Sequence, residues 1–237
     1  YGITTEVTAT PRTSCERYTF PAGEGHIILN LGQGLTNESG AMVRRVSSTE
    51  VEGMKLLGTF CYTTQAVFPI YFVMRVSREP STAGPWKFQP KLQGVESAWS
   101  PDDGTYKLYE NYHREIAGDD IGYRFSYDDL GEGEQVTVRM GVSFVSIENA
   151  RMNLEAEQQG KTFDQLRAEA TAQWNHDLGR IRIEGGTSDQ QTIFYTALYH
   201  ALIHPSIISD VNGEYPKMES GDTGKADYTR YSVFSLW

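Results

Sequence analysis

Adjacent acidic residues are the first candidates for chemistry in this sequence, because two neighbouring carboxylates can serve as general acid and general base. They occur at Asp102-Asp103, Asp119-Asp120 and Asp128-Asp129. Each pair lies in a glycine-containing stretch that is typical of a turn, where aspartate is favoured by its local hydrogen bonds. We therefore interpret all three pairs as solvated turn residues.

Two patterns could bring metal ligands together. The stretch Asp210–Gly213 resembles part of an EF-hand calcium loop, but that alignment puts Ile208 at the first loop position, where an oxygen ligand is required. His200 and His204 stand four residues apart without the intervening glutamate of a zinc-protease helix. We assign no metal ligand, and we interpret Asp210–Gly213 as the turn after a helix.

Nucleophilic and phosphate-binding motifs are missing from the sequence. There is no G-x-S-x-G elbow, and the glycines of GEGHIILNLGQG lack the strand-to-helix order of a phosphate loop. Cys15 and Cys61 leave two alternatives open, a disulfide or two buried thiols. No catalytic residue is assigned from these patterns.

Aromatic residues are the remaining chemical signal, with 14 Tyr, 10 Phe and 4 Trp. Aromatic rings can bind the flat faces of sugars, but buried aromatic cores are commoner. The core interpretation is favoured for Trp86, Trp99 and Trp174, whereas composition does not decide the role of Trp237.

Composition limits the class of protein. The chain has 237 residues and a formal net charge of −10, with 39% hydrophobic and 22% charged residues, as in a folded globular protein. Because no basic stripe is present, we expect no nucleic-acid partner, and no apolar run is long enough for a membrane span. Tyr1 opens directly into a strand-like pattern, so we expect that an upstream part, with any export signal, lies outside the sequence.

Residues 1–147 alternate with a period of two and are interrupted by short turn clusters, which predicts antiparallel sheets packed as a sandwich or barrel. No segment between the strands is long enough for the crossover helices of a parallel sheet. The strands that we expect are Ile3–Thr10, His26–Leu31, Met42–Ser48, Leu56–Thr63, Val67–Val76, Tyr106–Tyr112, Gly122–Tyr127 and Gln135–Val145.

Helical periodicity begins after residue 147. Ile147–Gln159 and Phe163–Leu178 are predicted helices, separated by Gly160 and ended by Gly179. Leu166, Ala170 and Trp174 are spaced to form one buried stripe. A short strand over Ile181–Glu184 follows.

A third helix is predicted over Asp189–His204, with Ser188 and Gln191 as its capping box. Apolar or aromatic residues occupy three of its faces, which is typical of a helix buried among neighbours. About thirty residues remain after it, so we expect the neighbours to be encoded further along and the helix to open a larger helical domain. A helix lying bare in solvent, or covered completely by the sheets, would count against this interpretation.

Four segments together resemble the bacterial α-mannosidases of glycoside hydrolase family 92. They are TEVTATPRTSCERYTFP, FVSIENARMNLEAE, RIEGGTSDQQTIFYTALYHALIHPSIISDVNGEYP and YTRYSVFSLW, and they follow the order of the family along the whole chain. The third is the most specific. One departure is Cys15-Glu16-Arg17, where the family pattern has His-Arg before YTFP.

The resemblance implies a mainly β fold with helices: an antiparallel, supersandwich-like β-sandwich, then linker helices and the start of an (α/α)6 toroid. We divide the chain into residues 1–147 (sandwich), 148–185 (linker) and 186–237 (truncated toroid). The implied reaction is calcium-dependent removal of terminal mannose from α-mannosides, such as glycoprotein glycans, with inversion. Inversion requires an acid and a base roughly 6.5–9.5 Å apart.

The resemblance also implies that the acid, the base and the Ca²⁺ ligands lie beyond Trp237, in the remainder of the same polypeptide. Of the residues that the family uses to bind its substrate, the resemblance assigns only Trp237 in this sequence, as a contact to the mannose ring. The loop Asp210–Pro216 either faces the cleft or serves as a structural connector. A periplasmic or extracellular location is a further implication.

Two other functions remain open: a sandwich-plus-toroid glycoside phosphorylase, and a non-catalytic carbohydrate-binding β-module. The sequence leaves the linkage preference undecided, with α-1,2 as the first expectation. The residues alone support only a β-sandwich followed by the start of a helical domain.

Overall fold

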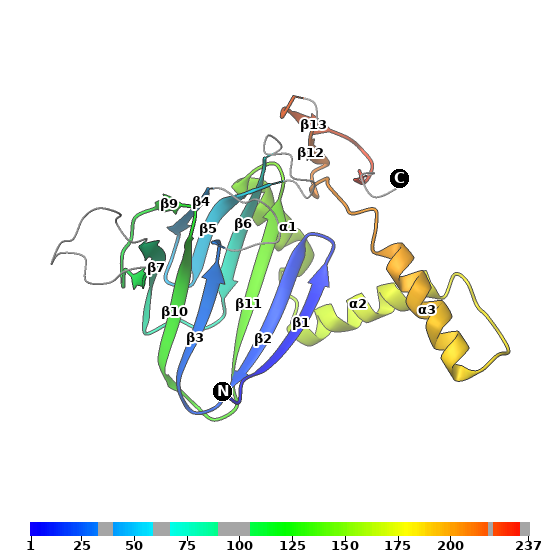
Figure 1. Cartoon of the computed structure of the whole chain (residues 1–237), viewed down its shortest axis with the longest axis horizontal. Coiled ribbons are helices and arrows are strands. Elements are labelled where there is room, and N and C mark those ends of the chain that lie inside the picture. Colours follow the sequence, from blue (N-terminus) through cyan, green and yellow to red (C-terminus); the bar gives the residue numbers. More distant parts are fainter. Residues whose placement is uncertain (33–39, 59–66, 90–104, 218–219, 233–237) are drawn as a thin grey trace.

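A computed structural model describes residues 1–32, 40–58, 67–89, 105–217 and 220–232, and all structural statements below refer to these residues. The chain forms an antiparallel β-sandwich with helices after it (Figure 1). The strands of the sandwich are β1 (Thr4–Thr10), β2 (Thr13–Phe20), β3 (Gly23–Asn30), β4 (Ala41–Arg45), β5 (Glu50–Leu57), β6 (Phe68–Val76), β7 (Thr82–Gln89), β8 (Thr105–Leu108), β9 (Ile116–Gly118), β10 (Ile121–Leu130) and β11 (Glu134–Ser143).

Two sheets make up the sandwich. The larger has the order β1-β2-β11-β6-β5-β4-β9 and the smaller β3-β10-β7-β8, with antiparallel pairing throughout. Strand β11 pairs with β2 and β6, so that Gly141 lies opposite Thr13 on one side and Val73 on the other. The predicted antiparallel sandwich is confirmed.

Alternating side chains of the two sheets meet in one core. Tyr123, Phe125 and Tyr127 of β10 are almost completely buried and face Val136 and Val138 of β11 across it. Burial of a large aromatic side chain contributes about 2 kcal/mol or more, so this core holds the sandwich together.

Two helices cover the outer face of the larger sheet, α1 (Ile147–Gln158) and α2 (Phe163–Leu178) (Figure 1). Helix α1 begins at the N-cap Ser146 and packs on β11 and β6. Helix α2 begins with a capping box of Thr162 and Gln165, and Gly179 is its C-cap, as predicted. Only the first turns of α2 lie on the sheet, where Leu166 is buried.

The predicted stripe along α2 is therefore wrong beyond its first half. Trp174 is 37% exposed, because the helix leaves the sheet, and its ring lies 4.7 Å from that of Tyr199 instead. The predicted strand Ile181–Glu184 is not formed. A lone strand needs a partner for its backbone groups, and no strand of the described residues pairs with this connection.

Helix α3 (Ser188–Leu202) projects away from the sandwich together with the end of α2 (Figure 1). Its capping box consists of Thr187 and Gln190, one residue earlier than predicted, because Thr187 already has the extended backbone of an N-cap. None of its side chains is buried, and Ile193 is 67% exposed. The described residues leave α3 bare, which is the arrangement stated above to count against a helix buried among neighbours. Cover by segments encoded further along the polypeptide stays a prediction.

Some strands of the structure, among them β2 and β7, were not predicted from the sequence patterns. Strand β7 contains Gly84 and Pro85, which disfavour strands on propensity alone. Strand β2 carries polar residues on both faces, because Arg17 bonds Glu6 and Asp164 while Cys15 lies under α2. Tertiary partners thus override the local pattern.

The chain then returns to the sandwich. After Pro205 it passes the β11–α1 junction and forms a hairpin of β12 (Glu214–Pro216) and β13 (Thr223–Lys225). Residues 228–232 run back beside residues 206–209, where Ile207 and Tyr231 form a β-bridge.

Candidate functional site

The loop Asp210–Pro216 meets the end of β11 and the start of α1 at a buried polar cluster. The Asp210 side chain is the centre: its residue is 5% exposed. Oδ2 accepts hydrogen bonds from Ser143 Oγ at 2.7 Å and Asn149 Nδ2 at 2.8 Å, and Oδ1 accepts one from Asn153 Nδ2 at 2.6 Å. A buried carboxylate needs such donors to offset its lost hydration.

Glu214 extends this cluster towards the surface. Its Oε2 accepts a second bond from Asn149 Nδ2, at 2.9 Å, and its backbone N–H donates to Asn212 Oδ1 at 3.0 Å. Hydrogen bonding by the Asn149 side chain, and secondarily by that of Asn212, holds the pKa of Glu214 below its ordinary value. The carboxylate is therefore ionised at neutral pH.

The contacts of the cluster favour the connector interpretation of the loop over a cleft-facing one. Both Asp210 side-chain oxygens accept hydrogen bonds from N–H and O–H donors of the protein, so they are directed into the junction. The amide nitrogens of Asn149 and Asn153 face it, whereas a Ca²⁺ site requires converging oxygens. Among the described residues no group of three or more His, Cys, Asp or Glu side chains could hold a metal ion.

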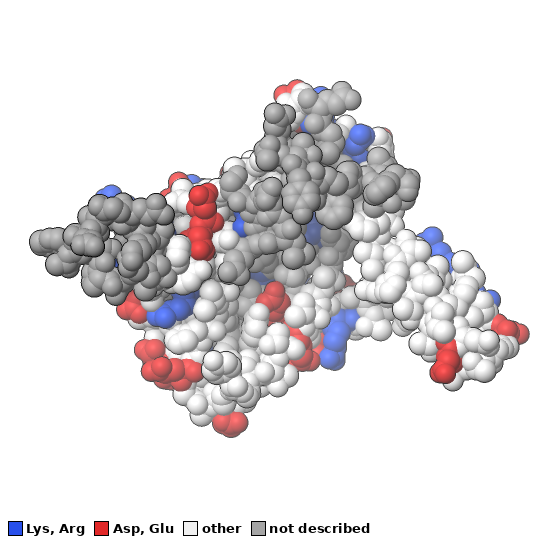
Figure 2. All heavy atoms as spheres, viewed as in Figure 1, with Lys and Arg blue, Asp and Glu red and all other residues white. Residues whose placement is uncertain are grey.

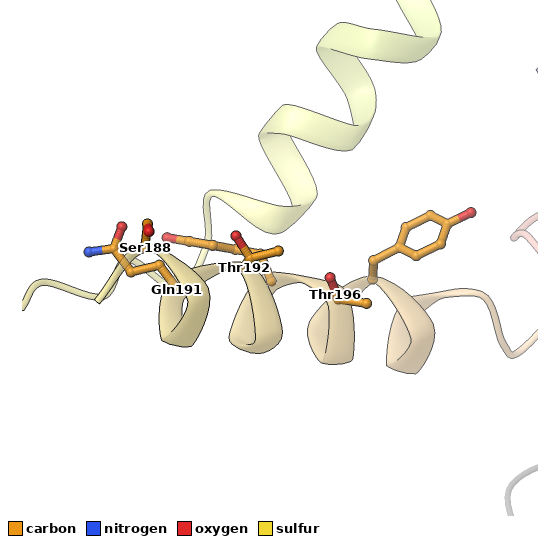
Figure 3. A pocket seen from close by; sticks show the side chains of 6 residues that line it. Ser188, Gln191, Thr192 and Thr196 are labelled. Carbon is orange, nitrogen blue, oxygen red and sulfur yellow. The ribbon is translucent and has the colours of Figure 1, made fainter. Parts of the chain in front are cut away.

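An open groove runs along α3, with a volume of about 560 Å³. Hydroxyl, amide and aromatic side chains line it: Ser188, Gln191, Thr192, Tyr195, Thr196 and Tyr199. Figure 3 shows that the labelled side chains project from one side of this helix. A groove with a single helical wall can contact a partner, but it does not enclose a small substrate.

The remaining candidates from the sequence are scattered. Asp119 accepts the backbone N–H of Gly40 at 2.9 Å in the turn before β10. Asp128 and Asp129 lie in the last residues of β10, not in a turn as expected, and Asp129 pairs with Arg78 at 2.7 Å. Asp102 and Asp103 lie outside the described residues.

Of the tryptophans, Trp86 is in the core at 9% exposure. The core interpretation is wrong for Trp174, as shown above. Trp99 and Trp237, the predicted sugar contact, lie outside the described residues, as does Cys61. Cys15 is a free, buried thiol between Phe163 and Leu166, where burial raises its pKa.

Sequence reasoning missed the polar cluster around Asp210. A signal was present: Asn149 and Asn153 stand four residues apart, on the face of the helix that also carries the buried Ala150 and Leu154. Two amides on an inward face indicate a buried polar partner, but the partner lies some sixty residues further along the chain.

The fold and this junction define a class of protein: an antiparallel sandwich whose outer helices lead into a helical segment anchored back on the sandwich. Residues 1–143 match the glycosyl hydrolase family 92 N-terminal domain, and residues 149–237 match the glycosyl hydrolase family 92 catalytic domain. The chain belongs to glycosyl hydrolase family 92.

Solved structures agree with this assignment. A family 92 α-mannosidase from Bacteroides thetaiotaomicron superposes with a TM-score of 0.80 at 27% identity, over 100% of this chain and 30% of its own. The structure of another glycosyl hydrolase of the family superposes with a TM-score of 0.79 at 25% identity, over 99% of this chain and 29% of its own. An inverting mannosidase from Bacteroides thetaiotaomicron, 23% identical, shares the fold with a TM-score of 0.77, over 98% and 28%.

A curated relative is also similar. The uncharacterized secreted glycosidase of Arthroderma benhamiae is 36% identical over 90 residues, which are 36% of this chain and 11% of that protein. The chain thus spans about a tenth of this relative and under a third of the solved structures. No helix in the described residues is long and apolar enough to cross a membrane.

Proposed function

We propose that this chain is part of an exo-acting α-mannosidase that releases terminal mannose from α-mannosides such as glycoprotein glycans, with α-1,2-linked mannose as the first substrate to test. Membership of family 92 supports a glycoside hydrolase. The observation that carries the proposal is the match to a family α-mannosidase over the whole chain, at a TM-score of 0.80. That relative also has a complex with mannoimidazole, which supports a mannose-containing partner.

The role of this portion is to act as scaffold and as an edge of the sugar pocket. The sandwich of residues 1–147 holds the linker of residues 148–185, and residues 186–237 begin the helical toroid that carries the reaction. Trp237 is the proposed wall for the mannose ring. The buried anchor at Asp210 supports the scaffold role, since it fixes the return of the chain to the sandwich.

Inversion and calcium dependence complete the proposal. An inverting enzyme positions an acid and a base on opposite sides of the sugar, with room for a water molecule. Among the described residues no group of three or more His, Cys, Asp or Glu side chains could hold a metal ion. In keeping with the resemblance to the family, we place the acid, the base and the Ca²⁺ ligands in the remainder of the polypeptide. Secretion is proposed because the relative in Arthroderma benhamiae is described as secreted.

The test uses the complete polypeptide that contains this chain. With an α-1,2-linked mannobiose we expect release of β-mannose, detected by NMR before mutarotation, and loss of that activity with a chelator until Ca²⁺ is restored. The isolated 237-residue chain is expected to release no mannose.

Three results would contradict the proposal. Activity that requires phosphate and yields mannose 1-phosphate would identify a phosphorylase. Binding of mannosides by the complete polypeptide without hydrolysis would identify a binding module. Calcium-dependent release of mannose by the isolated chain would refute the placement of the catalytic groups.

A further inference from the structure

The residue before Asp210 is also buried and hydrogen-bonded. Ser209 is 2% exposed, and its carbonyl oxygen accepts a hydrogen bond from Arg12 Nε at 2.6 Å. Arg12 in turn pairs through Nη1 with Glu157 at 2.8 Å, in the last turn of α1. The turn between β1 and β2 and the far end of α1 therefore support the same point of the chain.

The residue after Asp210 adds a third attachment. The backbone N–H of Val211 donates to Asn153 Oδ1 at 2.9 Å, while Nδ2 of the same Asn153 donates to Asp210 and to the carbonyl of Val142. Each polar atom of this asparagine thus has a fixed partner. Three consecutive residues, 209–211, are thus hydrogen-bonded to the sandwich and to α1, so the chain has little freedom to shift at this point.

The anchored residues hold the last described segment of the chain. Ser209 Oγ accepts the backbone N–H of Arg230 at 2.9 Å. The backbone N–H of Ile208 donates to the Arg230 carbonyl at 2.9 Å, and that of Ser232 to the Ser206 carbonyl at 2.7 Å. Residues 230–232 thus depend for their position on residues 206–209, which are continuous with Asp210.

We propose that Asp210 is a positioning residue: through its bonds to Ser143, Asn149 and Asn153 it transmits the geometry of the β11–α1 junction to the paired segments 206–209 and 230–232. As far as it concerns sugar binding, the proposal rests on the proposed function, in which Trp237 stands five residues beyond Ser232. A charged acceptor with three directed donors permits one arrangement of the loop, where an apolar contact would permit several.

The kinetic test compares variants of the complete polypeptide. We expect Asp210→Asn, which sets an N–H donor against the donors of the cluster, to raise KM for an aryl α-mannoside about tenfold, with kcat changed about twofold or less. Ser209→Ala, which removes the acceptor for Arg230, is expected to raise KM about threefold. The matched control is Asp227→Asn, an exposed aspartate of the same returning segment, which should leave both constants unchanged.

Hydrogen exchange supplies a readout that does not depend on activity. In Asp210→Asn, peptides covering residues 206–209 and 229–232 should exchange about tenfold faster than in the parent protein, while peptides of β10 and β11 stay protected. If Asp210 had a merely structural role, exchange would instead become faster throughout the sandwich or would not change in any peptide. If Asp210→Asn does not fold, the same measurements on Ser209→Ala test whether residues 206–209 position residues 230–232.

The outcomes separate the two proposals. Unchanged exchange at residues 206–209 and 229–232 would overturn the positioning role, whatever the polypeptide hydrolyses. Faster exchange with an unaltered KM would overturn its link to sugar binding. A parent polypeptide without mannosidase activity would instead refute the proposed function and leave exchange to decide on Asp210.

Discussion

Glu50 and Glu52 show how little the type of a residue says about its role. They stand two apart on β5, so they share the sheet face that α1 covers, and both are less than a tenth exposed. Arg151 of α1 bridges them, with 2.6 Å from Nη1 to Glu50 Oε1 and 2.5 Å from Nη2 to Glu52 Oε2. Arg75 and Arg44 occupy the remaining oxygens. Two close carboxylates thus form an ion cluster that binds helix to sheet.

We predict at this scale that Arg151→Ala destabilises the protein by about 2 kcal/mol, because it leaves two buried carboxylates with one guanidinium fewer. For a chain of this size the melting temperature should fall by roughly 4–8 °C in a thermal unfolding scan. The control is Arg180→Ala, which breaks an exposed pair with Asp177 and should cost about 0.5 kcal/mol or less. Equal losses in the two variants would show that the cluster contributes no more than a surface pair.

Helix α1 packs closely on β11 because Gly141, at the contact, has no side chain. A Cβ atom at Gly141 would stand 2.3 Å from the Ala150 carbonyl oxygen and 2.7 Å from Leu154 Cβ. Ala150 and Leu154 are buried against Val73 of β6 in a small apolar cluster. The same side of α1 carries Asn149 and Asn153, so the close approach at Gly141 also brings the amides to Asp210.

Gly141→Ala should therefore push α1 away from β11 and destabilise the protein by about 1–3 kcal/mol, as in other overpacked cores. Gly131→Ala is the matched control, because a Cβ atom at Gly131 would meet Glu134 Oε2 at 3.5 Å, an ordinary van der Waals contact. Chemical denaturation of both variants measures the difference. A Gly141→Ala protein as stable as the control would mean that the helix is not seated as described.

At the scale of the whole molecule, the uncovered helix α3 is the main feature to explain. Figure 2 shows that the projection formed by α3 and the end of α2 is mostly free of charged residues on the face in view. Ile193, Tyr199 and Leu202 are 67%, 40% and 43% exposed. Large exposed apolar patches mark surfaces that bind a partner, and the family structures that the chain matches are more than three times as long.

We expect Ile193→Lys to act differently in two contexts. In the isolated chain the side chain is in solvent, so the melting temperature should change little, by an amount corresponding to about 0.5 kcal/mol or less. In the complete polypeptide, burial of an unpaired ammonium group among the later helices of the proposed toroid should cost several kcal/mol. The two melting shifts, measured side by side, test whether α3 is covered. Equal shifts would contradict an enclosed helix.

Local patterns predicted the elements that depend on local causes. The period of two in residues 1–147, the break at Gly160 and the C-cap at Gly179 follow from side-chain alternation and backbone preference, and the structure has the sandwich and both helices. The local patterns did not predict β7, which forms because it pairs with strands distant in the sequence. They also did not predict the exposure of the outer half of α2, which results because the helix leaves the sheet.

The sequence by itself determined the antiparallel sandwich, the three helices and the resemblance to family 92, because periodicity, caps and ordered motifs are written in neighbouring residues. Only the tertiary structure decided that Asp210 meets Asn149 and Asn153, and that Glu50 and Glu52 are held by arginines. These contacts join residues up to about a hundred positions apart, and such pairing is fixed by packing of the layers, which no local pattern encodes.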